Sequence, residues 1–413
     1  MADEMHGGDA AAVCLPRWGA VVPYQGSVTW VVVDPAGVVV EPIRRFLADF
    51  VARGRSASSI RSYAYALLRW WRWLAFAGVS WNRATSAQVR DFVLWLSQAV
   101  KPRRHRRTKT LLSAGTVNPI TRKRNLGDGY EPRTIRHSNA VLRSFYDFWC
   151  DAADGVLVNP VPLAKGGAHA YAHRSPLEPA LPVGRLRYNP PVPRRRPRSI
   201  PDQRWNELFA RLRSNRDRAL LAMSVSNGCR ASELLGVASS DVDWGEQRVR
   251  VCRKGSGAEQ WLPVSPDGLV WLMLYLADLG EPLAPDEPLW WTVRRRDRGD
   301  GRRRQPLNYE ALRAVMRRVN AGLGTNWSMH DVRHTCALRM AQDKTLSLRD
   351  VQSILGHQHL STTAEIYLVE HDDEVIRRVL THLAERQLRP AAPAPAAGYD
   401  SGVLDVLFGG GTS

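Results

Sequence analysis

The chain has 413 residues, of which 44% are hydrophobic, so it is long enough for two folded domains and too apolar to be disordered as a whole. Its formal net charge of +18 indicates a polyanionic partner, with nucleic acid as the first candidate and an anionic membrane surface as the rival. No apolar run approaches the ~20 residues of a membrane-spanning helix. Five cysteines without Cys-x-x-Cys spacing indicate neither a disulfide framework nor a zinc site.

Residues 1–40 form an N-terminal extension in which little regular structure is predicted. Two valine triplets, Val31–Val33 and Val38–Val40, flank Asp34-Pro35 and are compatible with a small hairpin. The acidic, glycine-rich start of the extension lacks the basic and apolar regions of a signal peptide.

Four helices are predicted over residues 41–155, which we expect to form one all-α domain. Apolar residues at three- and four-residue spacing place them from about Glu41, from Ser58 to Gly78, after Thr85 and from about Pro132 to Ala152. Gly78 suits a helix C-terminus, and Thr85 with Gln88 resembles a capping box at the start of the third helix.

Basic clusters lie between these helices and beyond them. The loop before the fourth helix holds two clusters, and a Pro-rich linker over residues 156–199 ends in another. A further segment, Arg294–Arg304, contains seven arginines. Guanidinium groups bind phosphate through two parallel donors, although each run is also compatible with a solvated loop. The candidate DNA contacts from the first three clusters are Arg103, Arg104, Arg106, Arg107, Arg122, Lys123, Arg124, Arg194, Arg195 and Arg196.

A second domain is predicted over residues 200–389. Helices are expected at about 201–213 and 216–226, and a β-rich stretch surrounds the turn Lys254–Gly257. No single polar residue here is informative, because a lone histidine or tyrosine on a helix is usually structural. Their order is the informative feature, and it runs Arg230, Glu233, Lys254, His330, Arg333, His357 and Tyr367.

In this order the residues resemble the motifs of the tyrosine recombinases, also called the phage integrase family. An arginine motif, a hairpin lysine, His-x-x-Arg, Leu-Gly-His and a following tyrosine occur together within residues 200–385, with Tyr367 ten residues after His357, where nine is usual in the family. The resemblance implies a fold that is mainly α with a small antiparallel β-sheet. An all-α core-binding domain, which binds DNA, would precede an α+β catalytic domain. The implied function is a site-specific DNA recombinase of the integrase or transposase type.

The chemistry explains why such an enzyme needs these residue types. Attack on a phosphodiester puts negative charge on the non-bridging oxygens, which Arg230 and Arg333 are suited to stabilise. His330 lies three residues before Arg333, so the two share a helix face, and His357 follows a glycine that ends a helix. By resemblance, Tyr367 is the nucleophile of a 3′-phosphotyrosine intermediate. Lys254, expected to be desolvated between arginines, would protonate the departing 5′-oxygen, and Glu233 would orient the cluster.

A phosphotyrosine bond preserves the energy of the phosphodiester, so we expect neither a metal nor any other cofactor. The resemblance implies double-stranded DNA with specific recombination sites as the partner, a homotetramer on that DNA, and a prokaryotic, nucleoid-associated cytoplasmic location. Accessory proteins are possible further partners, and no membrane partner is expected.

The apolar stripe at 372–387 is compatible with packing on its own domain or with docking on a neighbouring subunit. The Ala/Pro tether over 390–413 ends in a second docking candidate, Val403–Phe408. His334 and His359 lie outside the motifs and are interpreted as surface or supporting residues.

Two other functions share these features. A type IB-like DNA topoisomerase uses the same nucleophile but acts as a monomer, and a non-catalytic DNA-binding relative would keep only the fold. The helical N-terminal domain and the C-terminal docking candidates favour recombination over relaxation. The presence of all six catalytic residues favours an active enzyme.

Overall fold

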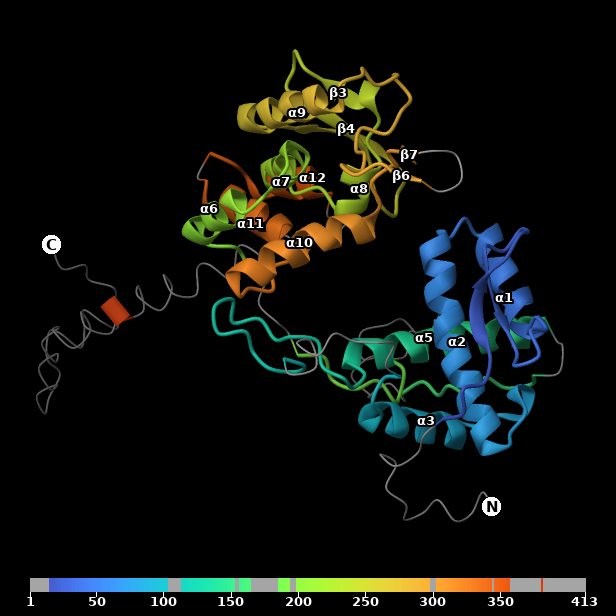
Figure 1. Ribbon diagram of the computed structural model, residues 1–413. Helices are drawn as coiled ribbons and strands as arrows, with labels where there is room; N and C mark the ends of the chain where they lie inside the picture. Colours follow the sequence, from blue (N-terminus) through green and yellow to red (C-terminus); the bar gives the residue numbers. More distant parts are fainter. Residues whose placement is uncertain are drawn as a thin grey trace, which may run out of the picture. The chain divides into compact units, whose positions relative to one another are not determined.

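The computed structural model divides the chain into an N-terminal unit, Met1–Arg194, and a C-terminal unit, Arg195–Ser413 (Figure 1). Each unit has a hydrophobic core of its own. Within the residues that the structure describes, no helix is long and apolar enough to cross a membrane. These residues are 15–102, 113–152, 156–164, 185–193, 198–297, 302–343, 345–356 and 380–381.

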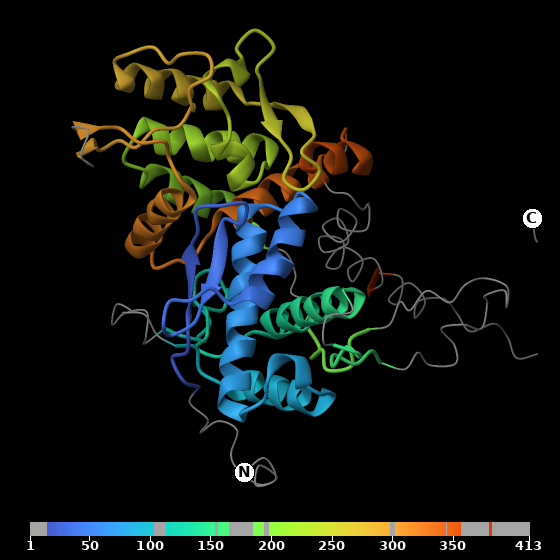
Figure 2. The same ribbon diagram turned by 90° about the vertical axis from the view of Figure 1, so that its right-hand side faces the viewer.

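The N-terminal unit consists of helices and one hairpin. Strands β1 and β2 pair antiparallel, with Ala20 opposite Val33 and Pro23 opposite Trp30, and the hairpin lies beside α1 and α2 (Figure 2). The described elements are β1 (Ala20–Pro23), β2 (Trp30–Val33), α1 (Glu41–Ala52), α2 (Ala57–Ala77), the 3-10 helix η3 (Trp81–Arg83), α3 (Ser86–Gln98) and α5 (Pro132–Asp151).

The helix ends of this unit follow local sequence signals. Ser56 caps α2 by accepting a hydrogen bond from the Ser59 amide, and Gly78 ends the helix in the left-handed conformation. At the start of α3, the Ala87 amide donates to Thr85 Oγ1 (3.3 Å) and the Thr85 amide donates to Gln88 Oε1 (2.9 Å). The predicted capping box is therefore confirmed.

Aromatic side chains fill the core of the N-terminal unit. Trp70 on α2 is fully buried, and its Nε1 donates to the Tyr146 hydroxyl on α5 (2.9 Å). That hydroxyl donates in turn to the carbonyl oxygen of Trp81 (2.8 Å). Burial raises the pKa of the Tyr146 phenol, even though the hydrogen bond from Trp70 opposes the shift. The hydroxyl thus links α5 to α2 and to η3, the 3-10 helix that follows α2 in the chain.

The valine triplets and the predicted linker make further contacts in this unit. The triplets pair as a short hairpin, with one antiparallel bridge between Val33 and Val39 and hydrogen bonds from the Asp34 amide to the Val38 carbonyl (2.8 Å) and from the Val40 amide to the Val32 carbonyl (2.9 Å), while Val31–Val33 also pairs with β1. Residues 156–164 and 185–193 of the predicted linker pack on the N-terminal unit. Val161 is buried in the core, and Arg136 and Asn139 on α5 donate to the carbonyls of Pro190 and Tyr188. The sequence does not predict these hydrogen bonds, because every residue type offers the same main-chain carbonyl acceptor.

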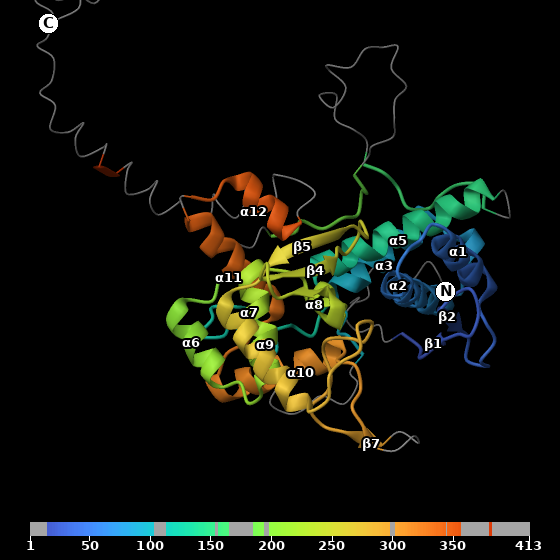
Figure 3. The same ribbon diagram turned by 90° about the horizontal axis from the view of Figure 1, so that it is seen from above.

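The C-terminal unit surrounds the buried helix α7, which lies between α9 and α11 (Figure 3). A three-stranded antiparallel sheet, in the order β3-β4-β5, lies at one side. The described elements are α6 (Asp202–Ala210), α7 (Asn215–Asn227), α8 (Ala231–Leu235), η5 (Ser239–Asp241), β3 (Val242–Asp243), β4 (Arg248–Cys252), β5 (Glu259–Pro263), α9 (Pro266–Leu279), β6 (Arg296–Asp297), β7 (Arg302–Arg303), α10 (Tyr309–Leu323), α11 (Met329–Gln342) and α12 (Leu348–Leu355).

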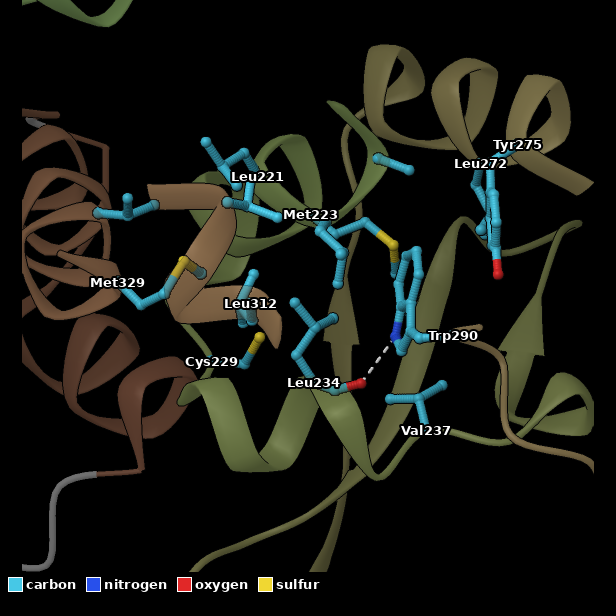
Figure 4. Close-up of a cluster of buried hydrophobic side chains, with 14 of the residues drawn as sticks. Leu221, Met223, Cys229, Leu234, Val237, Leu272, Tyr275, Trp290, Leu312 and Met329 are labelled. Carbon is cyan, nitrogen blue, oxygen red and sulfur yellow. Dashed lines mark hydrogen bonds between the residues drawn. The ribbon is translucent and has the colours of Figure 1, made fainter. Parts of the chain in front are cut away.

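The core of this unit positions the short helix α8. Leu234 and Trp290 are buried side by side, and Trp290 Nε1 donates to the carbonyl oxygen of Leu234 (2.8 Å; Figure 4). Cys229 is buried in the same cluster, directly before α8. Packing on both sides of Arg230 therefore fixes its backbone. The predicted fold class, mainly α with small antiparallel sheets, is confirmed.

Candidate active site

Arg230 stands at a tight junction between α7 and α8. Gly228 ends α7 in the left-handed conformation (φ 64°), and a Cβ atom there would lie 2.7 Å from Leu355 Cδ2. Only glycine fits this approach. Arg230 then serves as the N-cap residue of α8, with a side chain that is 33% exposed. Its guanidinium is thus attached to a rigid backbone and still accessible.

The Glu233 carboxylate lies at the centre of the site. Its side chain is fully buried and accepts four hydrogen bonds. Oε2 accepts from the Arg230 amide (2.8 Å) and from Arg253 Nη1 (3.2 Å), and Oε1 accepts from Arg230 Nη1 (2.8 Å) and the Lys254 amide (3.0 Å). Burial alone would raise the pKa of Glu233, but the hydrogen bonds and the Arg230 charge lower it below its usual value. Glu233 is therefore an ionised anchor for three neighbouring residues.

Lys254 lies at the start of the turn between β4 and β5. These strands pair antiparallel, with Arg248 opposite Pro263 and Cys252 opposite Glu259. The Arg253 amide continues the pairing by donating to the Ala258 carbonyl (2.8 Å). The Lys254 side chain is exposed, which differs from the expectation of a desolvated lysine. The turn projects it beyond the sheet, while its own backbone amide is held by Glu233.

Arg333 reaches the same cluster from α11. It is 6% exposed, and its Nη1 and Nη2 donate to the carbonyl oxygens of Gly228 (2.7 Å) and Leu355 (2.6 Å). Burial and the neighbouring Arg230 charge lower the pKa of Arg333 to about 10, so it stays a cation at neutral pH. An anion bound beside Arg230 and Arg333 would relieve this repulsion.

His330 precedes Arg333 by one helical turn and is exposed. Its Nε2 lies 2.9 Å from Nε2 of His334, and the two rings meet edge to face with centroids 4.2 Å apart. His334 is expected from the motifs to lie outside the site, but its spacing of four residues from His330 puts the two on one face of the helix. Arg253 was also missed, and only its position beside Lys254 pointed to it.

The structure thus brings together Arg230, Glu233, Lys254 and Arg333, with Arg253 as an additional cation. Arg230 and Arg333 lie beside the Glu233 carboxylate, and the Lys254 amide and Arg253 are hydrogen-bonded to it. This excess of positive charge suits an anion such as a phosphodiester. In the part of the chain that the structure describes, no group of three or more His, Cys, Asp or Glu side chains could hold a metal ion.

Most of the remaining predicted residues lie outside the part of the chain that the structure describes. His357, Tyr367 and His359 lie outside the described residues, as do the segments 372–379 and 382–413, although α12 ends at Leu355 and Gly356, directly before His357. Among the basic candidates, Arg122 and Arg124 are exposed in a turn of the N-terminal unit, where Arg124 Nε donates to the Gly115 carbonyl (2.9 Å), and Lys123 between them is half-buried. The others, Arg103, Arg104, Arg106, Arg107, Arg194, Arg195 and Arg196, also fall outside the described residues.

The chain is similar to known proteins along most of its length. Residues 200–374 match the phage integrase family, and residues 43–115 match the phage integrase N-terminal SAM-like domain. Tyrosine recombinase XerD of Ralstonia nicotianae is 31% identical over 179 residues, which are 42% of this chain but only half of that protein. Tyrosine recombinase XerC of Myxococcus xanthus is 32% identical, over 47% of this chain and 65% of the relative. Transposase A from transposon Tn554 of Staphylococcus aureus is 21% identical over 87% of this chain and 95% of its own length.

Solved structures share the fold. The XerH site-specific recombinase, in a post-cleavage complex with a palindromic difH substrate, superposes with a TM-score of 0.51 at 14% identity and covers 80% of this chain and 82% of XerH. A lambda integrase dimer bound to a COC′ core site gives a TM-score of 0.50 at 14% identity, over 79% of this chain and 94% of the other. The predicted family is confirmed: this chain belongs to the phage integrase family, the tyrosine recombinases.

Proposed function

We propose that the chain is a site-specific DNA recombinase that cuts and rejoins DNA through a covalent bond to Tyr367. The observation that carries this proposal is the convergence of Arg230, Arg333 and the Lys254 turn on the buried carboxylate of Glu233. These three cations come from separate elements and occur in the family's motif order. The relatives of this chain are tyrosine recombinases and a transposase.

The proposed reaction assigns one task to each side chain. Arg230 and Arg333 stabilise negative charge on the non-bridging oxygens, since each guanidinium keeps N–H groups beyond those used in its protein hydrogen bonds. His330 and His357 add donors to the same phosphate. As the Tyr367 oxygen bonds to phosphorus, the phenol proton is lost to solvent. The bond from phosphorus to the 5′-oxygen breaks, and that oxygen takes a proton from Lys254.

Double-stranded DNA with specific recombination sites is the proposed substrate. The XerH neighbour was solved with a palindromic difH substrate and the lambda integrase neighbour with a COC′ core site, and the charge of +18 suits a polyanion. The exposed Arg122 and Arg124 are proposed backbone contacts of the N-terminal unit. A homotetramer on DNA, with the C-terminal segment docked on a neighbouring subunit, is the proposed assembly.

A role in moving a mobile element is the more specific proposal. It is supported by the match to Transposase A, which extends over 95% of that relative. No observation favours a topoisomerase that relaxes DNA without a specific site.

Covalent capture tests the proposal. Nicked duplexes tiled across the DNA that flanks the coding sequence would trap the intermediate, because the short strand released by cleavage diffuses away. The wild-type chain should give an SDS-resistant protein–DNA adduct on one duplex. Tyr367→Phe should bind that duplex equally well and give no adduct, while Tyr399→Phe should behave as wild type. An adduct that persists in Tyr367→Phe would contradict the assignment of the nucleophile.

A further inference from the structure

Side chains from outside α12 bind the last three carbonyl groups of that helix. Gln260 Nε2 donates to Ser353 (3.0 Å), Arg253 Nη2 to Ile354 (2.5 Å) and Arg333 Nη2 to Leu355 (2.6 Å). Carbonyls in the last turn of a helix have no partner within the helix, and the negative end of its dipole favours cations. Two of the three donors, Arg253 and Gln260, come from the β4–β5 hairpin that carries Lys254.

Arg253 makes three hydrogen bonds within the protein, one from each guanidinium nitrogen. Besides its bond to the Ile354 carbonyl, Nε donates to Gln260 Oε1 (2.8 Å) and Nη1 donates to Glu233 Oε2 (3.2 Å). The residue is 6% exposed. Arg230, by comparison, is 33% exposed. All three partners of Arg253 belong to the hairpin, to Glu233 or to α12, so its contacts hold the Lys254 hairpin in place.

The fit between Arg253 and the end of α12 depends on a glycine. A Cβ atom on Gly356 would lie 3.0 Å from Arg253 Nε and 3.1 Å from Cζ, and Gly356 has a φ of 61°. The guanidinium therefore packs directly on the backbone at the point where the helix ends. Any side chain at this position would displace it.

Lys254 is the residue that needs such an anchor. Its side chain is a flexible four-carbon stem that projects from a solvent-exposed turn, so its reach depends on where the backbone is held. Two contacts fix that backbone: the Lys254 amide donates to Glu233, and Arg253, one residue earlier, is bound to Glu233 and α12. Gln260 attaches the opposite strand of the hairpin to the same helix end.

We propose that Arg253 is a positioning residue for Lys254, which it holds within reach of the departing 5′-oxygen by anchoring the hairpin to the C-terminal end of α12, with Gln260 as a second arm. This inference rests on the proposed function, in which Lys254 supplies the proton to that oxygen. It predicts that loss of Arg253 impairs proton delivery and leaves stabilisation of the phosphate charge intact.

A substrate with sulfur in place of the scissile 5′-oxygen separates the two effects. When its phosphorus–sulfur bond breaks, the sulfur leaves as a thiolate with the bonding electron pair and needs no proton, because thiols are far more acidic than alcohols. On the oxygen substrate, Arg253→Met should cleave about a hundredfold more slowly, a typical loss for general-acid catalysis, and on the sulfur substrate within about threefold of wild type. Lys254→Ala should show the same rescue, whereas Arg333→Lys should be impaired on both.

Two further variants guard against simple loss of folding. Gln260→Leu removes only the second arm, at a partly exposed position, and should give a smaller defect that the sulfur substrate also rescues. Arg248→Gln, on β4, changes an arginine that is bonded to Asp243 and lies over Trp261, and should cleave both substrates as wild type.

Either of two results would overturn the role of Arg253. One is an equal loss on both substrates for Arg253→Met and Gln260→Leu, which would mean that they act on the phosphate charge. The other is no loss on the oxygen substrate. If the wild-type chain formed no adduct on either substrate, the proposed function itself would fail instead.

Discussion

Glu233→Gln should destabilise the C-terminal unit by about 3–6 kcal/mol, although the two side chains have nearly the same shape. The carboxylate accepts four hydrogen bonds, two at each oxygen. An amide would present a donor at one of these positions, so two of the four donors would lose their acceptor. At about 1.5–3 kcal/mol for each hydrogen bond to a charged group, the loss is about 3–6 kcal/mol. Breaking a buried ion pair by removing one partner costs a similar amount, about 3–5 kcal/mol.

Hydrogen–deuterium exchange of the full chain in increasing urea is a suitable assay, because it reports the opening of α8 and β4 separately from the N-terminal unit. Glu259→Gln is the matched control. Glu259 is 67% exposed and pairs with Arg250 at 3.2 Å, so its loss should cost about 0–1 kcal/mol. A change below about 1 kcal/mol for Glu233→Gln would refute the reasoning, since it would mean that Glu233 contributes no more than a surface ion pair.

The same substitution has a defined pH dependence. The pKa of Glu233 is lowered in the folded chain from its ordinary value of 4.5, so the folded state binds fewer protons than the unfolded state in the interval between the two values. The stability that ionised Glu233 contributes is therefore fully present above its unfolded pKa and is lost as the pH falls through the folded value. The difference between wild type and Glu233→Gln should be constant at about pH 6–8 and shrink in acid below the unfolded value.

Two further substitutions test the packing around the site and in the N-terminal unit. Gly228→Ala should destabilise the C-terminal unit by about 2–4 kcal/mol in the same exchange assay, because the new Cβ meets Leu355 and the backbone conformation is left-handed; a neutral result would contradict the close approach. Tyr146→Phe should destabilise the N-terminal unit by about 1–3 kcal/mol, since it leaves Trp70 Nε1 buried without its acceptor, and an unchanged opening of α2 and α5 would show that another acceptor replaces it.

Local signals in the sequence predicted most of the helices and strands. Periodic apolar residues located α1, α2, α3 and α5, and the capping residues Thr85 and Gln88 located the start of α3. The predicted strands around Lys254 are β4 and β5. These predictions succeeded because each helix or strand is defined by side chains that are close together in sequence. The capping residues that end a helix are also close to it in sequence.

Contacts between distant segments were not predictable in the same way. Val31–Val33 pairs with β1 along its whole length and with the nearer valine triplet through one bridge, and only the second pairing is suggested by the sequence. The exposure of Lys254 follows from the projecting turn, which its position between arginine motifs does not reveal. His334 looked peripheral, since its contact with His330 depends on the rotamers of both side chains.

Motif order identifies the residues that meet the phosphate, but it cannot identify the residues that hold them. Arg333 and Arg253 bind the carbonyl oxygens of Leu355 and Ile354, and every residue type offers the same acceptor there. The sequence therefore identifies the arginine in each interaction but not the backbone carbonyl that it binds. Arg253 is adjacent to Lys254, so the sequence offers it as a second catalytic candidate, whereas its three partners in the structure are the hairpin, Glu233 and α12. For this reason the division between the accessible Arg230 and the anchoring Arg253 could come only from the structure.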